Sequence, residues 1–168
     1  MAKASGLGDN FYVGGYDLSG DVGSLQTIRG GPAALDVTAI NKSAFERLGG
    51  LRDGEISFNT FFNDATGQEH LTLRALPTTD IHVMYCRGTT LGNAAAAMVA
   101  KQVNYDPTRG PDGQLTMVTQ ALANAFGLSW GKLLTAGKRT DTTATNGSSV
   151  DFSTGSTSFG LVAFLQRV

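Results

Sequence analysis

The chain has 168 residues, only 16% of them charged, and a formal net charge of -1 at pH 7. This length fits one domain with a sizeable core, so we expect residues 1–168 to form a single domain. The sequence contains no cluster of lysine and arginine, which argues against tight binding of DNA or RNA.

The first forty residues predict short extended segments. Residues 1–9 are expected to form a loose arm ahead of the folded part. The pair Gly14-Gly15 permits a kink or bulge between two extended pieces. Alternation of Leu35, Val37 and Ala39 with polar residues indicates a later strand. The expected extended pieces are residues 10–13, 16–18, 25–28 and 35–39.

Residues 41–62 predict a helical turn followed by a strand. Asn41 or Ser43 can cap a helix of one or two turns, which Gly49 and the glycine after it would end. Residues 55–62 then give the cleanest apolar-polar alternation of the chain, as expected for a strand with one buried face. Its apolar face carries Ile56, Phe58 and Phe62, and its polar face carries Glu55, Ser57 and Asn59.

A short helix and another strand are expected next. Asp64 or Thr66 can cap a helix over 68–76, which would cover one face of the sheet before Pro77 ends it. Residues 80–87 alternate again and predict a strand. Near the end of the chain, residues 127–134 and the almost continuously apolar residues 159–166 predict two more strands.

The longest alternating runs predict a protruding hairpin. Residues 95–105 and 114–124 exceed the usual strand length of about five or six residues. They are joined by residues 106–113, whose Gly-Pro-Asp-Gly sequence suits a chain reversal. Residues 94–100 are rich in alanine and could instead form a helix, but alternation that continues into the turn favours a strand. A hairpin this long is easiest to explain if a neighbouring subunit completes it.

Together these elements predict a mainly β fold, a β-sandwich or partly closed barrel with one or two flanking helices and a long protruding hairpin. The single cysteine, Cys86, excludes an intramolecular disulfide and a thiolate metal cluster. No signal-peptide core and no run of about 20 apolar residues is present, so we expect synthesis in a reducing cytoplasm and no membrane span.

Catalytic and metal-binding patterns are missing. His70 and His82 have no second ligand at a suitable spacing, and Cys86 lies about 13 Å along a strand from His82, too far for a dyad. The glycines of residues 14–20 lack phosphate-binding spacing. Three aspartates are expected to form turns rather than a cation site: Asp17, Asp21 and Asp36. We therefore expect no enzyme, cofactor or metal.

Several short strings occur along the chain in a fixed order. They are YDLSGDV at 16–22, ALDVT at 34–38, GLRDGEISF at 50–58 with FFND at 61–64, and AKQVNYDPTRG at 100–110. In this order they resemble the major tail (tube) proteins of long, non-contractile-tailed bacteriophages, especially those of actinobacterial hosts. The resemblance covers most of residues 10–134.

The resemblance implies a β-sandwich subunit that forms hexameric rings stacked into a tube, through which genomic DNA passes without tight binding. The implied partners are other copies of the chain, tape-measure protein, and tail-terminator or tip proteins. The implied location is the virion tail, after assembly in the host cytoplasm. Relatives often carry a further C-terminal domain outside the tube, so we expect that such a domain is missing from residues 1–168.

The resemblance also assigns roles to residues. The long hairpin would reach a neighbouring subunit, and residues 1–10 would order on assembly. The candidate inter-subunit residues are Ala97, Val99, Lys101, Val103, Tyr105, Arg109, Leu115, Met117 and Val118. The candidate lumen-facing residues are Glu55, Ser57 and Asn59.

Two other functions remain open from the sequence. A capsid-decorating or other virion adhesion module could have the same general build. A carbohydrate-binding β-sandwich would need clustered exposed aromatic residues, but the chain has one tryptophan, Trp130, and four dispersed tyrosines.

Overall fold

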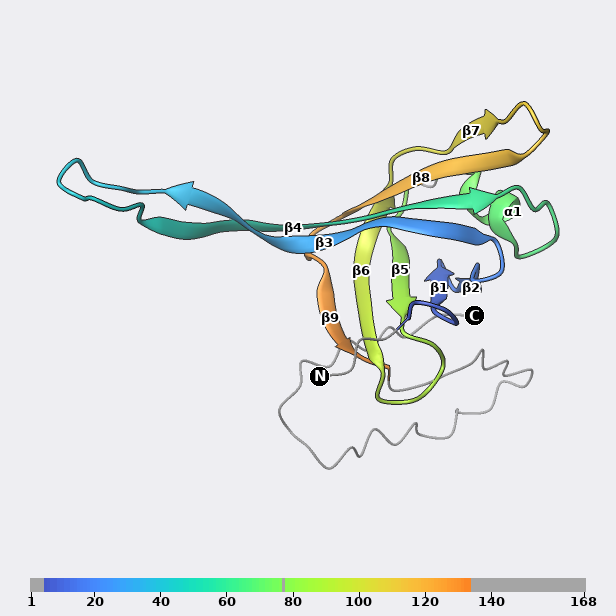
Figure 1. The fold of residues 1–168 in the computed structure, drawn as a ribbon, viewed down its shortest axis with the longest axis horizontal. Helices are drawn as coiled ribbons and strands as arrows, with labels where there is room; N and C mark the ends of the chain where they lie inside the picture. Colours follow the sequence, from blue (N-terminus) through green and yellow to red (C-terminus); the bar gives the residue numbers. More distant parts are fainter. Residues whose placement is uncertain (1–4, 77, 134–168) are drawn as a thin grey trace.

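The computed structural model describes residues 5–76 and 78–133, which form one antiparallel sheet and one short helix (Figure 1). The mainly β prediction is therefore confirmed. The strands are β1 (Asn10–Val13), β2 (Tyr16–Asp17), β3 (Val22–Asp36), β4 (Arg47–Phe61), β5 (Ile81–Cys86), β6 (Ala94–Gln102), β7 (Asp106–Arg109), β8 (Leu115–Ala123) and β9 (Ser129–Lys132). Helix α1 spans Glu69–Leu73.

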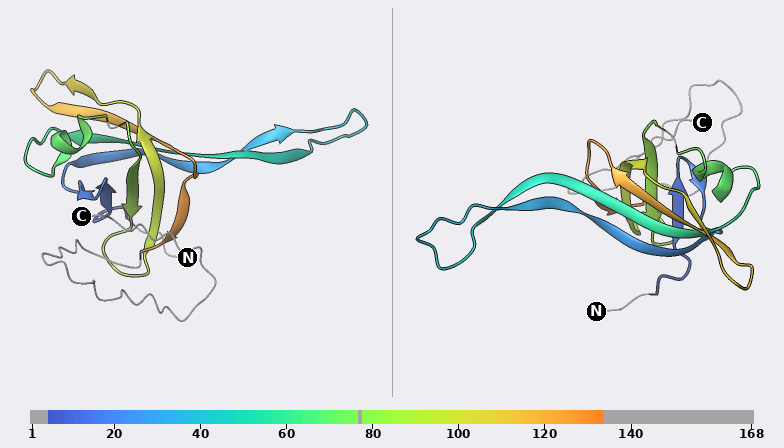
Figure 2. Two further views of the ribbon diagram at one scale, coloured as in Figure 1. Left: turned by 180° about the vertical axis from the view of Figure 1, so that it is seen from behind. Right: turned by 90° about the horizontal axis from the view of Figure 1, so that it is seen from above.

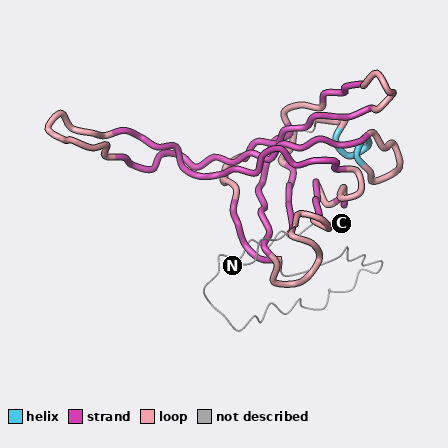
Figure 3. The backbone as a smooth tube through the Cα atoms, in the orientation of Figure 1, coloured by secondary structure: helices cyan, strands magenta, loops and turns pink. Residues whose placement is uncertain are grey.

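The sheet is open and sharply bent. Its hydrogen-bonded order is β2-β1-β5-β6-β8-β4-β3, with β7 pairing to β8 and β9 pairing to β6. The strands β5, β6 and β9 run across the direction of β3, β4 and β8 (Figures 1 and 3). Only three residue pairs, from Ala100↔Ala123 to Gln102↔Ala121, join β6 to β8. This short junction lets the two halves of the sheet fold over each other.

The core lies between these two halves. Phe11 on β1 meets Phe58 on β4 with ring centroids 4.6 Å apart, a tilted contact that joins opposite ends of the sheet order. Ile56 and Phe58 are buried, as their alternation predicted, whereas Phe62, the third residue of the predicted buried face, lies beyond β4 and is 41% exposed. Each large apolar side chain buried here contributes about 1.5–3 kcal/mol. Other core residues are Val13, Leu18, Leu73, Val83, Met98 and Ala121.

The alanine-rich segment is a strand, so the helical alternative for residues 94–100 is wrong. β6 pairs with β5 along six residues and with β9 and β8 at its two ends. Ala95, Ala96 and Ala97 are all buried in it. Small side chains suit this central position because neighbouring strands and the core crowd both faces of β6.

Residues 95–124 do not form the protruding hairpin that was predicted. β6 is a central strand, and β8 pairs with β4 and β7 as well as with β6. Within residues 95–124, it is the shorter β7–β8 hairpin that extends from the body, through pairs such as Asp106↔Val118 and Arg109↔Leu115. The chain leaves β6 at residue 103, and the Asn104 side chain accepts a hydrogen bond from the Gln120 backbone N–H at 2.7 Å. That contact redirects the segment before β7 begins.

The long protruding hairpin is formed by β3 and β4 instead, each 15 residues long (Figure 2). The helical turn predicted for 41–49 is wrong, because residues 37–46 form the loop at the end of this hairpin and β4 begins at Arg47. A backbone hydrogen bond from Val37 N–H to the Glu46 carbonyl closes the loop at 3.0 Å. Gly49 and Gly50, which were predicted to end a helical turn, lie within β4, and the glycines at 30–31 lie within β3.

Other predicted elements differ in smaller ways. α1 is shorter than predicted, and strands at residues 10–13 and 81–86 occur where the sequence placed them. Residues 5–9, part of the predicted loose N-terminal segment, lie against the body, where Arg87 forms an ion pair with Asp9 at 3.1 Å. Residues 1–4 and the predicted strand at 159–166 lie outside the described residues. Within the described part, no helix is long and apolar enough to cross a membrane.

Candidate assembly surface

The outer part of the β3–β4 hairpin is the most exposed feature of the fold, and we call residues 31–53 the arm. It projects from the body in every view (Figures 1 and 2). Leu35 pairs with Leu48 and Asp36 pairs with Arg47, so the ladder continues almost to the loop. A two-stranded ribbon gains little stability by itself in water. The arm is therefore a structure that benefits from a covering surface.

The arm is unusually apolar for a structure that its own chain leaves uncovered. Leu35 and Leu48 occupy directly opposed positions, so their side chains share one face of the ribbon, and they are 51% and 59% exposed. Leu51 is 90% exposed and Phe45 is 69% exposed. Contiguous exposed apolar surface on a strand pair is typical of protein association sites. The other large hydrophobic residues exposed on the arm are Val37 and Ile40.

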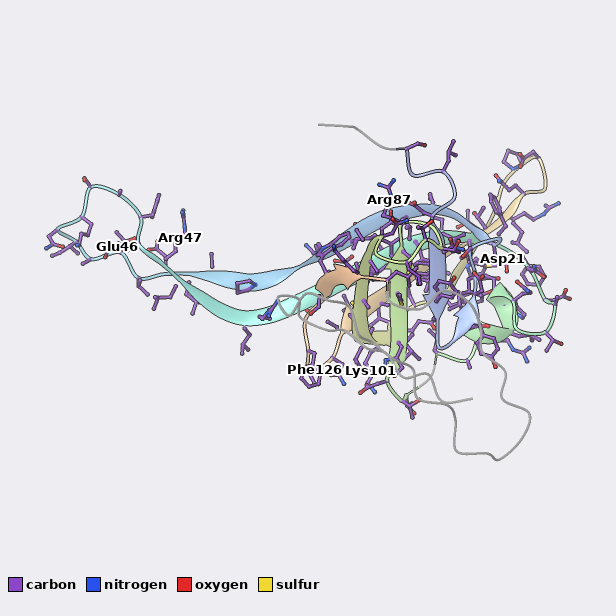
Figure 4. All side chains as sticks on the ribbon, turned by 90° about the horizontal axis from the view of Figure 1, so that it is seen from below. Asp21, Glu46, Arg47, Arg87, Lys101 and Phe126 are labelled. Carbon is purple, nitrogen blue, oxygen red and sulfur yellow. The ribbon has the colours of Figure 1, made fainter. Side chains whose placement is uncertain are left out.

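The loop of the arm is held by hydrogen bonds and a cation–ring contact among its own residues. The Asp36 carboxylate accepts hydrogen bonds from the Thr38 hydroxyl and backbone N–H, which lower the pKa of Asp36. The Thr38 hydroxyl in turn accepts from Glu46 N–H at 2.9 Å. The Arg47 guanidinium lies over the Phe45 ring, 4.9 Å from its centroid. Figure 4 shows Glu46 and Arg47 at the far end of the arm, away from the body.

A buried polar cluster fixes α1 at the opposite end of the molecule, where Figure 4 places Asp21. Asp21 caps the helix, because one carboxylate oxygen accepts from the Glu69 backbone N–H at 3.1 Å. Its other oxygen accepts from the Asn63 amide at 2.8 Å. Gln68, the residue at the helix start, makes no side-chain capping bond. The cap predicted at Asp64 or Thr66 is thus supplied by a residue distant in sequence.

Glu69 is the buried carboxyl of this cluster. It accepts hydrogen bonds from the Thr60 hydroxyl at 2.9 Å and the Tyr105 hydroxyl at 3.3 Å. Burial raises the pKa of Glu69, and the hydrogen bonds only partly offset it. Burial and the nearby Glu69 likewise raise the pKa of Tyr105. His70 Nδ1 lies 2.9 Å from the same Tyr105 oxygen, which ties the helix to the segment before β7.

The nine residues proposed for the inter-subunit hairpin do not form one surface. Ala97 and Met117 are buried in the sheet, whereas Val103 and Arg109 are exposed. Lys101 forms an ion pair with Asp80 at 2.8 Å. The others are partly buried, with Tyr105 in the polar cluster: Val99, Tyr105, Leu115 and Val118. Their spread follows from the central positions of β6 and β8.

The three residues proposed for the lumen do share one face of β4. Glu55, Ser57 and Asn59 lie on the face opposite to Ile56 and Phe58. The face is polar, since Glu55 forms an ion pair with Arg29 at 2.5 Å and accepts from the Gln120 amide at 2.7 Å. Neighbouring side chains on β3 and β8 leave Glu55 and Ser57 only 8% exposed.

The described residues offer little catalytic chemistry. They contain no group of three or more histidine, cysteine or acidic side chains placed to hold a metal ion. Burial raises the pKa of Cys86 to about 11, so its thiol stays protonated at neutral pH. A groove of about 370 Å³ runs between β3 and the start of β1, where the two ends of the open sheet approach. Phe11, Leu25 and Tyr85 line it together with polar side chains.

The arm is a candidate functional feature that sequence reasoning missed. The alternation of residues 35–39 predicted a strand, but Gly49 and Gly50 were expected to end a helical turn, so no second strand was expected to pair with it. The available signal was the presence of large apolar residues in a segment rich in turn formers. It is unfavourable to expose several large apolar side chains in a solvated loop, so another surface is expected to cover Leu35, Leu48 and Leu51.

No protein-family model matches the chain, and no curated protein matches its sequence. Similar folds occur in structures of gene transfer agent (GTA) particles. One is a chain in the tail of an empty GTA particle from helical refinement with C6 symmetry, with TM-score 0.55 and 17% identity over 77% of this chain and 98% of that chain. Another belongs to the virion of a native GTA particle, with TM-score 0.55 and 15% identity over 76% and 98% of the two chains. This likeness shows that the chain shares its fold with these virion components.

Proposed function

We propose that the chain is a structural tail protein of a phage-like particle, specifically a tail tube subunit that assembles into stacked, hexameric rings. The observation that carries this proposal is the apolar arm, uncovered by its own chain, on a fold shared with a chain of a tail of C6 symmetry. The ordered sequence strings resembling siphophage tail tube proteins support the same function.

In this proposal the arm binds a neighbouring copy of the chain. Covering Leu35, Leu48 and Phe45 would remove large apolar side chains from water, each worth about 1.5–3 kcal/mol when fully buried. The arm lies at one end of an elongated subunit, and in this proposal it docks on a different surface of the neighbouring copy. Contacts between unlike surfaces generate closed rings or open stacks, depending on the rotation between copies.

We propose that the face of β4 that carries Glu55, Ser57 and Asn59 is the side of the sheet turned toward the passage for DNA. Side chains of the neighbouring strands lie over the buried Glu55, and the Arg29 ion pair balances its charge. A conduit must release the genome, and phosphate contacts by many cations would retain it. We propose that the subunit meets tape-measure and terminator or tip proteins, acts without catalysis, and assembles in the host cytoplasm before residing in the virion tail.

Electron microscopy of the purified full chain tests this function. We expect rings or tubes at high protein concentration, and their loss in the double variant L35D/L48D. The matched control is L91D, because Leu91 is also an exposed leucine, 61% accessible, but lies in the loop before β6. A chain that stays monomeric at every concentration would argue against a tube. Binding to assembled capsids without tube formation would favour the capsid-decoration alternative.

A further inference from the structure

The body of the protein ends at a defined point along the β3–β4 hairpin. Gly30 and Gly54 are cross-strand partners, and Leu128, only 4% exposed, packs against both of them. A Cβ atom on Gly30 would lie 2.7 Å from Leu128 Cβ, and one on Gly54 would lie 2.6 Å from the Leu128 backbone N. These distances leave no room for a side chain. Leu128 therefore holds the bare backbone of the hairpin against the body at this pair.

The pairing of β3 with β4 becomes irregular immediately beyond that contact. Gly31 has a φ of 150° and nothing lies within 4 Å of where its Cβ would be. The register shifts between Pro32 and Ala34, which marks a β-bulge or irregularity. Pro32 cannot donate a backbone hydrogen bond. Opposite Ala34 is Gly49, which offers no side chain for cross-strand packing.

Further out the arm is regular again. Leu35↔Leu48 and Asp36↔Arg47 are paired without a further shift, and the loop is closed by the hydrogen bonds of Asp36 and Thr38. Two ordered parts are thus joined by a short segment that has an irregular register and in which Gly31, Gly49 and Gly50 offer no side chain for cross-strand packing. This is the arrangement of a hinge, in which a few residues absorb the change in backbone angles.

We propose that residues 31–34, together with Gly49 and Gly50 on β4, form a hinge about which the outer part of the arm, residues 35–48, swings as one rigid body. The free subunit then samples a range of arm directions, and contact with any covering surface selects one of them. Leu128 sets the inner limit of the motion because it fixes the Gly30–Gly54 pair. The hinge is a property of the single chain, so it stands or falls independently of the proposed tube.

Distances between spin labels in the purified, monomeric full chain test the hinge. In a Cys86→Ala background, one pair of cysteines at Gln26 and Ala44 spans the hinge from β3 to the loop. A second pair at Leu35 and Ala44 lies wholly beyond the hinge, within residues 35–48. All three positions are exposed. We expect the distance distribution of the first pair to be about twice as wide as that of the second, because rotation about the hinge changes only the distance that spans it.

A substitution at the hinge provides the second measurement. A side chain at Gly49 has ordinary contact space, with Pro32 3.6 Å from its Cβ position, so Gly49→Val adds cross-strand packing without a clash. We expect G49V to narrow the distribution that spans the hinge and to leave the distribution within the arm unchanged. Gly20→Val is the control, since Gly20 has open space and lies far from the arm in the sequence.

Two results would overturn the hinge. Equal widths for the two label pairs would mean that the arm is a rigid extension of the body. A broad distribution for the pair within the arm would mean that the whole arm frays, with no pivot. The two distance distributions measured with Gly49 unchanged already distinguish these outcomes, so the test does not depend on folding of G49V. Failure to form tubes would not affect it, because only the single chain is measured.

Discussion

Leu35 and Leu48 face each other across the arm, and both side chains remain more than half exposed. A directly opposed apolar pair normally stabilises a sheet by packing, at about 0.2–1 kcal/mol. Here both side chains of the pair stay largely open to water. The presence of two leucines at these positions is therefore better explained by binding to another surface than by the stability of the single chain. The effect of removing them on monomer stability distinguishes the two explanations.

The double variant L35A/L48A should leave the monomer almost as stable as wild type. Because both side chains are largely exposed, we expect the free energy of unfolding to fall by about 0.5 kcal/mol or less per site. Phe58→Ala is the contrasting variant, since Phe58 is 1% exposed, and should lose about 3–5 kcal/mol. Urea denaturation at low protein concentration measures both. A large loss in L35A/L48A would show that the arm packs on its own body.

Asp21 should prove more important for α1 than the acidic residue nearest to it in sequence. Asp21→Ala removes the acceptor for both Glu69 N–H and the Asn63 amide, so we expect a loss of about 1–3 kcal/mol. Asp21→Asn keeps one acceptor oxygen and should recover part of that loss. Asp64→Ala is the control and should be nearly neutral. Thermal unfolding followed by circular dichroism checks the order of the three variants.

The buried Glu69 should make stability depend on pH in a definite direction. Its folded pKa is raised above the ordinary value of 4.5, so its contribution is fully present below 4.5 and is lost as pH rises through the folded pKa. Glu69→Gln keeps an acceptor for Thr60 but does not titrate. We therefore expect wild type to lose stability relative to E69Q on going from acidic to neutral pH.

Comparison of the two proteins isolates Glu69, because His70, Tyr105 and the other titrating groups are present in both. Urea denaturation at a series of pH values gives the difference in unfolding free energy at each pH. A difference that stays flat, or that moves in favour of wild type as pH rises, would contradict the burial of an unfavourably placed carboxylate.

Two glycines of β4 should respond oppositely to the same substitution. Gly54→Ala would place a Cβ 2.6 Å from the Leu128 backbone N, which cannot move without displacing the segment before β9. We expect a loss of about 1–3 kcal/mol, typical of overpacking. Gly49→Ala meets only ordinary contacts and should be neutral or slightly stabilising, because alanine reduces the freedom of the unfolded chain. Equal effects in chemical denaturation would mean that Leu128 does not clamp the hairpin.

Local patterns predicted the strands of the body well. Residues 55–61 and 81–86 place their apolar side chains Ile56, Phe58 and Val83 in the core, so their alternation predicted the strands and the core-facing side. The helix near Glu69 was also recognisable, but its cap was not, because Asp21 reaches it from 48 positions away. Contacts between distant parts of the chain leave no periodic signal in either segment.

The two main errors have a common physical origin. Alternation shows that a strand has two unlike faces, but not which strand pairs with which. Residues 95–124 were read as an isolated hairpin, although β6 and β8 each pair with several strands. Conversely, Gly30, Gly49 and Gly54 resemble chain breaks, yet bare backbone is what allows Leu128 to pack there and the ladder to continue.

The continuity of β4 has a mechanical consequence. The same strand that forms one side of the arm, from Arg47, runs on into the body and ends at Phe61. Tension applied at the loop therefore passes along the covalent backbone into the seven residue pairs that join β4 to β8. Those hydrogen bonds lie across the direction of pull and would be loaded together, in shear, instead of being opened one after another. An arm that continues a central strand in this way can withstand more tension than a loop that is attached only at the surface of the body.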